Sequence, residues 1–159
     1  PADVAEEVAA ARERLIEAAA ENDEDLGDRY LNGEDISPDE IITAVRFAPV
    51  RAAAYAKLYQ RASRFAIVGV AAALEVADGV IGSARIGLTG ALSSAVRLPY
   101  VEEALVGQAP TAETASNAAK GAGTSLSDVN ADLHASEEYR RAMVSVFTKR
   151  AIEGALARV

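Results

Sequence analysis

The sequence contains no cysteine, no tryptophan and a single histidine, and only 5% of its 159 residues are aromatic. Without cysteine there can be no disulfide, no thiolate nucleophile and no cysteine-ligated zinc or iron–sulfur site. The single histidine, His134, has no paired carboxylate at metal-ligand spacing, so we interpret it as a loop or surface residue. We therefore predict no metal-binding residues, and a core built mainly from Ala, Val, Leu and Ile.

Long hydrophobic runs are also missing. No apolar stretch reaches the roughly 18 residues that a membrane-spanning helix requires. The first residues are acidic, whereas a secretory signal begins with basic ones. We therefore expect no membrane association and a cytoplasmic location.

The net charge of −8 is distributed unevenly. Residues 1–40 carry 14 acidic and 3 basic side chains, whereas residues 41–159 carry 10 acidic and 13 basic ones. The acidic part would repel phosphates, and the excess of three positive charges in the remainder is too dilute for a basic groove. We expect no nucleic-acid partner, and we predict two parts, at residues 1–40 and 41–159.

The acidic part has the pattern of a helical hairpin. Apolar residues recur at spacings of four and three, which places them on one helix face: Val4, Val8, Ala11, Leu15 and Ala18. A short second helix is predicted through Leu26 and Leu31, ending at Asn32-Gly33.

The remainder begins with strand signals. β-Branched and aromatic residues predict a strand over Ile41–Phe47. Further strands are predicted over Phe65–Val76, Val80–Gly90 and Ala95–Leu98, with Asp78-Gly79 as the tight turn of a hairpin.

Helical spacing appears on both sides of these strands. We predict helices over Arg51–Arg64, Tyr100–Val106 and Thr111–Gly121, a loop over Gly121–Asp128, and a long helix from Ser136. We expect the face of the last helix to be marked by Tyr139, Met143, Val146, Phe147 and Leu156. Strands grouped centrally with helices after them indicate an α+β fold.

The remaining motifs give no catalytic residues. Gly121–Thr124 is glycine-rich but follows a predicted helix, and no Lys-Ser or Lys-Thr comes after it. Ser93 and Ser94 have no partnered base nearby in the sequence. Because neither Walker-type nor dinucleotide-type spacing occurs, we do not expect an autonomous nucleotide enzyme.

Several motifs nevertheless follow one another in order along the second part: Lys57–Val68, Asp78–Ile81, Ala84–Gly90, Val96-Arg97, Val101–Gly107, Ser127-Asp128 and Ser136–Met143. Together they resemble the carboxy-terminal domain of the FAD-binding medium subunit of molybdenum hydroxylases, of the aerobic carbon monoxide dehydrogenase type. The resemblance covers about residues 41–156. It implies a small antiparallel sheet of three to four strands packed against helices, which agrees with the pattern above.

The resemblance also implies a functional setting. In such subunits FAD is held mainly by two preceding domains, whose glycine-rich pyrophosphate loops are absent from this sequence. We therefore expect a non-catalytic packing domain that binds no cofactor alone, although the family implies FAD and molybdopterin and iron–sulfur partner subunits. Lys57, with Arg61 and Ser63 beside it, corresponds to a segment near the isoalloxazine edge, where a cation would stabilise reduced flavin. The alternative is a solvent-facing helix end.

The first part resembles a different family. The motifs are Ala5–Glu7, Arg12–Leu26, Tyr30–Glu34 and Ile36-Ser37. They are similar to a helical segment of the GTPase domain of elongation factor G, without that domain's GTP-binding motifs. Two unrelated pieces suggest an engineered or recombined chain.

Three functional hypotheses follow from these resemblances. The first is a structural domain with no activity of its own, which self-associates through apolar surface to give a homo-oligomer. The second is a fragment of an FAD-dependent oxidoreductase subunit that contributes to electron transfer when complemented. The third is a ribosome-associated module.

Overall fold

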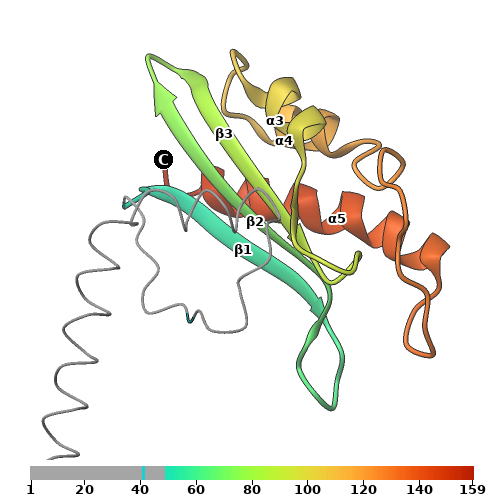
Figure 1. Cartoon of the computed structure of the whole chain (residues 1–159). Coiled ribbons are helices and arrows are strands. Elements are labelled where there is room, and N and C mark those ends of the chain that lie inside the picture. Colours follow the sequence, from blue (N-terminus) through green and yellow to red (C-terminus); the bar gives the residue numbers. More distant parts are fainter. Residues whose placement is uncertain (1–40, 42–48) are drawn as a thin grey trace, which may run out of the picture. The chain divides into compact units, whose positions relative to one another are not determined.

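A computed structural model describes residue 41 and residues 49–159 (Figure 1). The predicted hairpin at residues 1–40 and the predicted strand at Ile41–Phe47, apart from Ile41 itself, lie outside the described residues.

Four antiparallel strands form one sheet in the order β1-β2-β3-β4. The strands are β1 (Ala52–Tyr59), β2 (Ala66–Ala77), β3 (Val80–Thr89) and β4 (Val96–Arg97). Asp78 and Gly79 join β2 to β3 with φ angles of 52° and 76°. Two consecutive positive φ angles are typical of the type I′ turn, which matches the twist of a hairpin. The predicted hairpin is therefore confirmed.

Three helices follow the sheet: α3 (Pro99–Leu105), α4 (Ala112–Ala119) and α5 (Glu137–Leu156). Helix α5 lies along β1 and β2, whereas α3 packs on β3 and α4 packs on α3 and α5 (Figure 1). The Ser136 hydroxyl accepts a 3.2 Å hydrogen bond from the N–H of Tyr139, which caps α5 as predicted. The α+β fold and these three helices are confirmed.

The helix predicted over Arg51–Arg64 is wrong, because most of this segment is β1. The spacing of Ala54, Tyr55, Leu58, Tyr59 and Ala62 fits one face of a helix, but the alanines of this segment fit a strand as well. The burial alternates with a period of two: Tyr55, Lys57 and Tyr59 are exposed, and the intervening side chains are more buried. Pairing along the whole length of β1 with β2 decides the conformation.

The core lies between the sheet and the helices. Its largest fully buried side chains come from the inner sheet face and from α3 and α5: Val68, Val70, Leu74, Ile81, Ile86, Leu88, Val101, Leu105, Val144 and Ile152. A Cβ at Gly154 of α5 would lie 3.0 Å from the Cβ of Ala54 on β1. Small residues at this contact bring α5 close to the sheet.

The buried face of α5 differs from the predicted one. Phe147 is buried, whereas Tyr139 is 46% exposed, and Met143, Val146 and Leu156 are only partly buried. The other buried positions of α5 include small and polar residues, and they are Arg140, Val144, Thr148, Ala151, Ile152 and Ala155. Because α5 lies close to the sheet, alanine is favoured on its buried face. The largest apolar side chains of α5 were therefore a poor guide to which face is buried.

Candidate functional site

An open pocket of about 480 Å³ lies on the outer face of the sheet, the face turned away from α5. It sits where the β1–β2 loop and the β3–β4 loop meet. Polar side chains dominate its lining, and they include Tyr55, Lys57, Thr89, Ser93 and Ser94. This volume is within the usual range for ligand pockets, about 300–1,000 Å³.

The strand register explains the pocket. Lys57 on β1 and Thr89 on β3 are both paired with Gly69 on the central strand β2. Because Gly69 has no side chain, a gap remains between the two polar residues. The Tyr55 side chain leans into this gap, and a Cβ at Gly69 would collide with the Tyr55 hydroxyl. A glycine in a central strand often marks such a close approach.

Lys57 is the predicted site residue that the structure brings to the pocket. Its side chain is exposed, and its Nζ donates a 3.1 Å hydrogen bond to the carbonyl oxygen of Arg64. This contact places the ammonium group beside Arg64, which also lines the pocket.

Arg61 and Ser63 lie in the β1–β2 turn and do not line the pocket. Ser63 builds the turn, because its N–H and hydroxyl contact the Gln60 Oε1 at 2.6 Å and 3.0 Å. Arg64 has a φ of 64°, and its guanidinium carbon lies 5.0 Å from the centre of the Tyr59 ring. The turn thus fixes the backbone that Lys57 contacts, while Arg61 is exposed.

Gly90 forms part of the pocket lining, directly after β3. It has a φ of 81°, and a Cβ there would collide with the carbonyl oxygen of Ala66. Both observations require glycine at this position. The close contact joins the start of β2 to the end of β3, so these two backbone segments form the wall of the pocket together.

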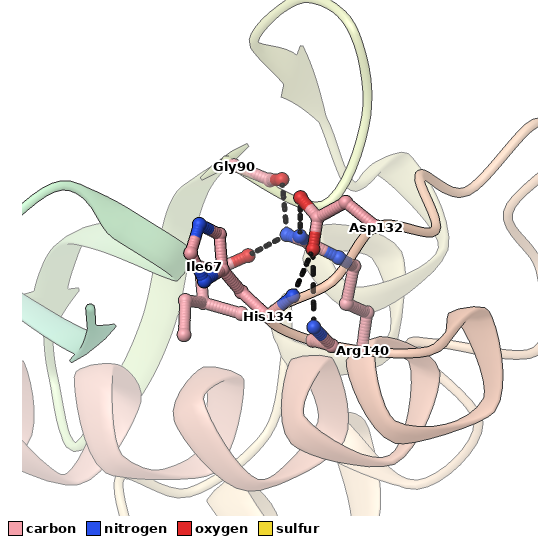
Figure 2. A network of polar contacts seen from close by, with 6 residues as sticks. Ile67, Gly90, Asp132, His134 and Arg140 are labelled. Atoms are coloured by element: carbon pink, nitrogen blue, oxygen red, sulfur yellow. Dashed lines mark hydrogen bonds and ion pairs between the residues drawn. The ribbon is translucent and has the colours of Figure 1, made fainter.

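Arg140 of α5 reaches the inner side of this wall (Figure 2). Its guanidinium is buried, with the side chain 5% exposed. The Nη1 atom donates hydrogen bonds of 2.8 Å to the Ile67 carbonyl and 3.0 Å to the Gly90 carbonyl. The Nη2 atom donates at 2.6 Å to Oδ2 of Asp132. One side chain therefore links both strand ends to the loop that precedes α5.

Asp132 organises that loop. Its Oδ1 accepts hydrogen bonds from the N–H of His134 at 2.8 Å and of Ala135 at 3.0 Å (Figure 2). The His134 N–H bond is the main cause that lowers the pKa of Asp132 below its ordinary 3.8; the Ala135 N–H and Arg140 add to it, against an opposing effect of desolvation. The His134 side chain is exposed, as predicted.

Two further observations concern only residue 41 and residues 49–159. No group of three His, Cys, Asp or Glu side chains there is arranged to hold a metal ion. None of the helices in this region combines the length and the apolar character needed to cross a bilayer.

A family comparison identifies the fold. Residues 53–155 match the model for the CO dehydrogenase flavoprotein C-terminal domain. The chain belongs to this family. The predicted resemblance to the C-terminal domain of the FAD subunit of molybdenum hydroxylases is thereby confirmed.

Relatives of known identity agree with this flavoprotein-domain assignment. The chain is 34% identical over 125 residues to the nicotine 6-hydroxylase medium subunit of Paenarthrobacter nicotinovorans, covering 77% of this chain and 44% of the relative. A solved structure of carbon monoxide dehydrogenase from Hydrogenophaga pseudoflava, which lacks the Mo-pyranopterin moiety of the molybdenum cofactor, matches with a TM-score of 0.62. That match is 31% identical and covers 70% of this chain and 39% of the other. The flavoprotein-type domain thus spans less than half the length of these relatives.

A stretch of 46 residues is 52% identical to elongation factor G 1 of a Synechocystis species, covering 29% of this chain and 7% of that protein. The assignment of this similarity to a helical segment at residues 1–40 stays a prediction. The recombined origin of the chain stays a hypothesis.

The pocket fits one part of FAD. A lysine cation, a tyrosine hydroxyl and a threonine hydroxyl suit the polar edge of a flavin ring, and the Tyr55 and Phe65 rings offer apolar surface. Gly121–Thr124 lies in a turn after α4 and is not part of this pocket. The residues at the pocket therefore fit the ring and offer no glycine-rich loop for the diphosphate.

Proposed function

We propose that this domain is a non-catalytic packing domain that supplies one wall of a flavin site in an FAD-binding oxidoreductase subunit. The observation that supports this proposal most directly is the position of Lys57 in the pocket lining. The family resemblance assigns it to the flavin edge, and it lines the pocket on the open sheet face. The domain contributes to electron transfer only together with the rest of such a subunit.

Two side chains account for the chemistry of this wall. The Lys57 ammonium provides a fixed positive charge, which stabilises the negative charge that a flavin ring gains on reduction. The Tyr55 hydroxyl, held over Gly69, provides a donor on the same side of the pocket. FAD, when bound, supplies the redox chemistry; the domain's own residues position the ring and influence its charge.

The proposed dependence on further domains rests on the pocket lining. The residues that line the pocket include no glycine-rich loop for a diphosphate, so the pocket by itself can hold only the ring part of FAD. We propose subunits that carry molybdopterin and iron–sulfur clusters as its partners, as the family implies. Self-association through exposed apolar residues is an alternative use of the same surface.

The proposal is tested with FMN at millimolar concentration, followed by amide chemical shifts of the 159-residue chain. We expect shifts at Tyr55, Lys57, Thr89 and Ser93, which surround the pocket. Lys57→Gln should weaken binding about tenfold, because a charge-assisted contact is lost. Arg61→Gln is the matched control, since it removes a positive charge from the neighbouring turn but does not alter the lining.

Two results would contradict the proposal. Shifts produced equally by ribose 5-phosphate would show that only the phosphate is attracted, and an absence of shifts at the pocket would show that the flavin binds elsewhere or not at all. Tight, stoichiometric binding of FAD by this chain would contradict its dependence on further domains.

A ribosome-associated role is a second candidate, favoured only by the 46-residue similarity to elongation factor G. Sedimentation with ribosomes tests it. If the chain remains in the supernatant at physiological salt, this candidate is rejected.

A further inference from the structure

Arg140 differs from the other arginines of α5 by its position between the helix and the pocket wall. Its two carbonyl partners, Ile67 and Gly90, each lie next to residues that line the pocket or line it themselves. The guanidinium approaches them from the inner side of the sheet, opposite to the side from which a ligand enters. Arg140 therefore acts on the wall without contacting the ligand.

The chemistry of the contact suits a positioning role. A guanidinium is planar and carries several donors at fixed angles, so it can hold two carbonyl groups and one carboxylate at once. Lysine would supply the same charge, but as a point charge without this geometry. The distances of 2.6–3.0 Å show that all three contacts are made together.

A second link strengthens the same wall. The N–H of Asn130 donates a 2.8 Å hydrogen bond to the carbonyl of Ala91, which follows Gly90. Asn130 lies two residues before Asp132, the carboxylate that Arg140 contacts. The loop before α5 thus holds the β3–β4 loop directly through Asn130 and indirectly through Arg140.

We propose that Arg140, oriented by Asp132, is a positioning residue for the flavin-edge pocket: it fixes the carbonyl groups of Ile67 and Gly90 and thereby the part of the pocket wall that Ala66 and Gly90 form. This inference rests on the proposed function for its ligand. The dependence of the pocket wall on Arg140 is independent of the proposed function.

The neighbouring residue Arg141 provides a matched control. It also donates to two backbone carbonyls, those of Gly123 and Leu126, at 2.9 Å and 2.8 Å, and it pairs with a carboxylate, that of Glu137. None of these residues lines the pocket. The two arginines thus have the same chemistry on the same helix, and only one of them supports the site.

The experiment compares Arg140→Lys with Arg141→Lys in the 159-residue chain. Amide chemical shifts without ligand are measured first. We expect Arg140→Lys to shift the amides of Ala66, Ile67, Gly90 and Ala91, and Arg141→Lys to shift those near Gly123 and Leu126. FMN titration then follows. We expect Arg140→Lys to lower the affinity about tenfold, since small displacements of binding groups have effects of at least this size, and Arg141→Lys to leave it unchanged.

Asp132→Asn is the second variant, because it keeps the guanidinium and alters an exposed loop residue. We expect a smaller loss of FMN affinity, with shifts at the same wall amides. It decides the question if Arg140→Lys does not fold.

The outcomes separate the two ideas. If the affinities of the Arg140 and Arg141 variants fall together in proportion to their urea midpoints, Arg140 is only a general stabiliser and the inference is wrong. If the wild-type chain does not bind FMN, the proposed function is wrong, and the shifts measured without ligand still decide whether Arg140 fixes the wall. Unchanged shifts at Ala66 and Gly90 would overturn the inference.

Discussion

The two faces of the sheet are built from the same strands but in different ways. On the inner face, large apolar side chains are fully buried against α5 and α3: Val68, Val70, Leu74, Ile86 and Leu88. On the outer face, the central positions are small: Gly69, Ala71, Ala73 and Gly87. Larger side chains on the outer face lie mainly on the strands beside β2, and they include Tyr55 and Lys57 of the edge strand β1. The inner face therefore supplies stability, while the outer face leaves space in which a site can form.

The largest expected difference between the faces concerns neighbouring residues of β3. Ile86 is fully buried, whereas Arg85 is exposed on the other face. Ile86→Ala should lower the free energy of unfolding by about 4 kcal/mol, because it removes buried methyl groups and leaves a cavity. Arg85→Ala should change it by less than about 0.5 kcal/mol. Urea unfolding of both variants measures this, and equal effects would show that the outer face is also covered.

The β2–β3 hairpin was predicted from the sequence better than the edge strand β1. Alternation along Val80–Gly90 and the Asp-Gly turn are local signals, so the β2–β3 hairpin could be predicted. The structure of β1 could not, because a run of alanines carries no period, and pairing with β2 decides it. Local patterns determine a hairpin with a tight turn, whereas an alanine-rich edge strand depends on its partner.

A second comparison concerns two glycines with positive φ, one at each end of β3. A Cβ at Gly79 meets nothing within 4 Å, whereas one at Gly90 collides with the carbonyl of Ala66. Gly79→Ala should cost about 1 kcal/mol, from backbone strain alone. Gly90→Ala should cost about 3 kcal/mol, because overpacking is added to the strain. Thermal unfolding gives both values, and similar costs would mean that the pocket wall yields easily.

The site was predicted less completely than the fold. Lys57 was chosen from the family resemblance and lines the pocket, and its role at a flavin stays a prediction, whereas Arg61 and Ser63 lie in the turn beside it. Tyr55 was missed, although Gly69 within a β-rich segment was a signal of a close approach. Arg140 could not be predicted, since its partners are 50 and 73 residues away in the sequence. Contacts of this kind depend on the completed fold.

The contact between Asp132 and Arg140, which joins the loop before α5 to the pocket wall, should make stability depend on pH. The pKa of Asp132 is lower in the folded chain than its ordinary 3.8, so its contribution to stability is complete above that value. It is lost as the pH falls through the lower folded pKa, because protonation weakens the contacts with the N–H of His134 and with Arg140. Urea midpoints measured from pH 6 to pH 2.5 should therefore fall more steeply for wild type than for Asp132→Asn. Parallel curves would show that the carboxylate contributes nothing.

The smallest expected effect is a gain in stability on the outer face. Gly87 lies in β3, opposite Ala71, and a Cβ there would meet nothing within 4 Å. Gly87→Thr should raise the free energy of unfolding by about 0.5 kcal/mol, because a β-branched residue favours a strand and glycine loses more backbone entropy on folding. The urea midpoint measures this gain, and Gly82→Thr, at the exposed position of β3 that has no partner on β2 because the register shifts there, serves as the control. A loss of stability at position 87 would mean that another surface packs closely on this face in solution, and the contrast between a covered and an open face would then no longer hold.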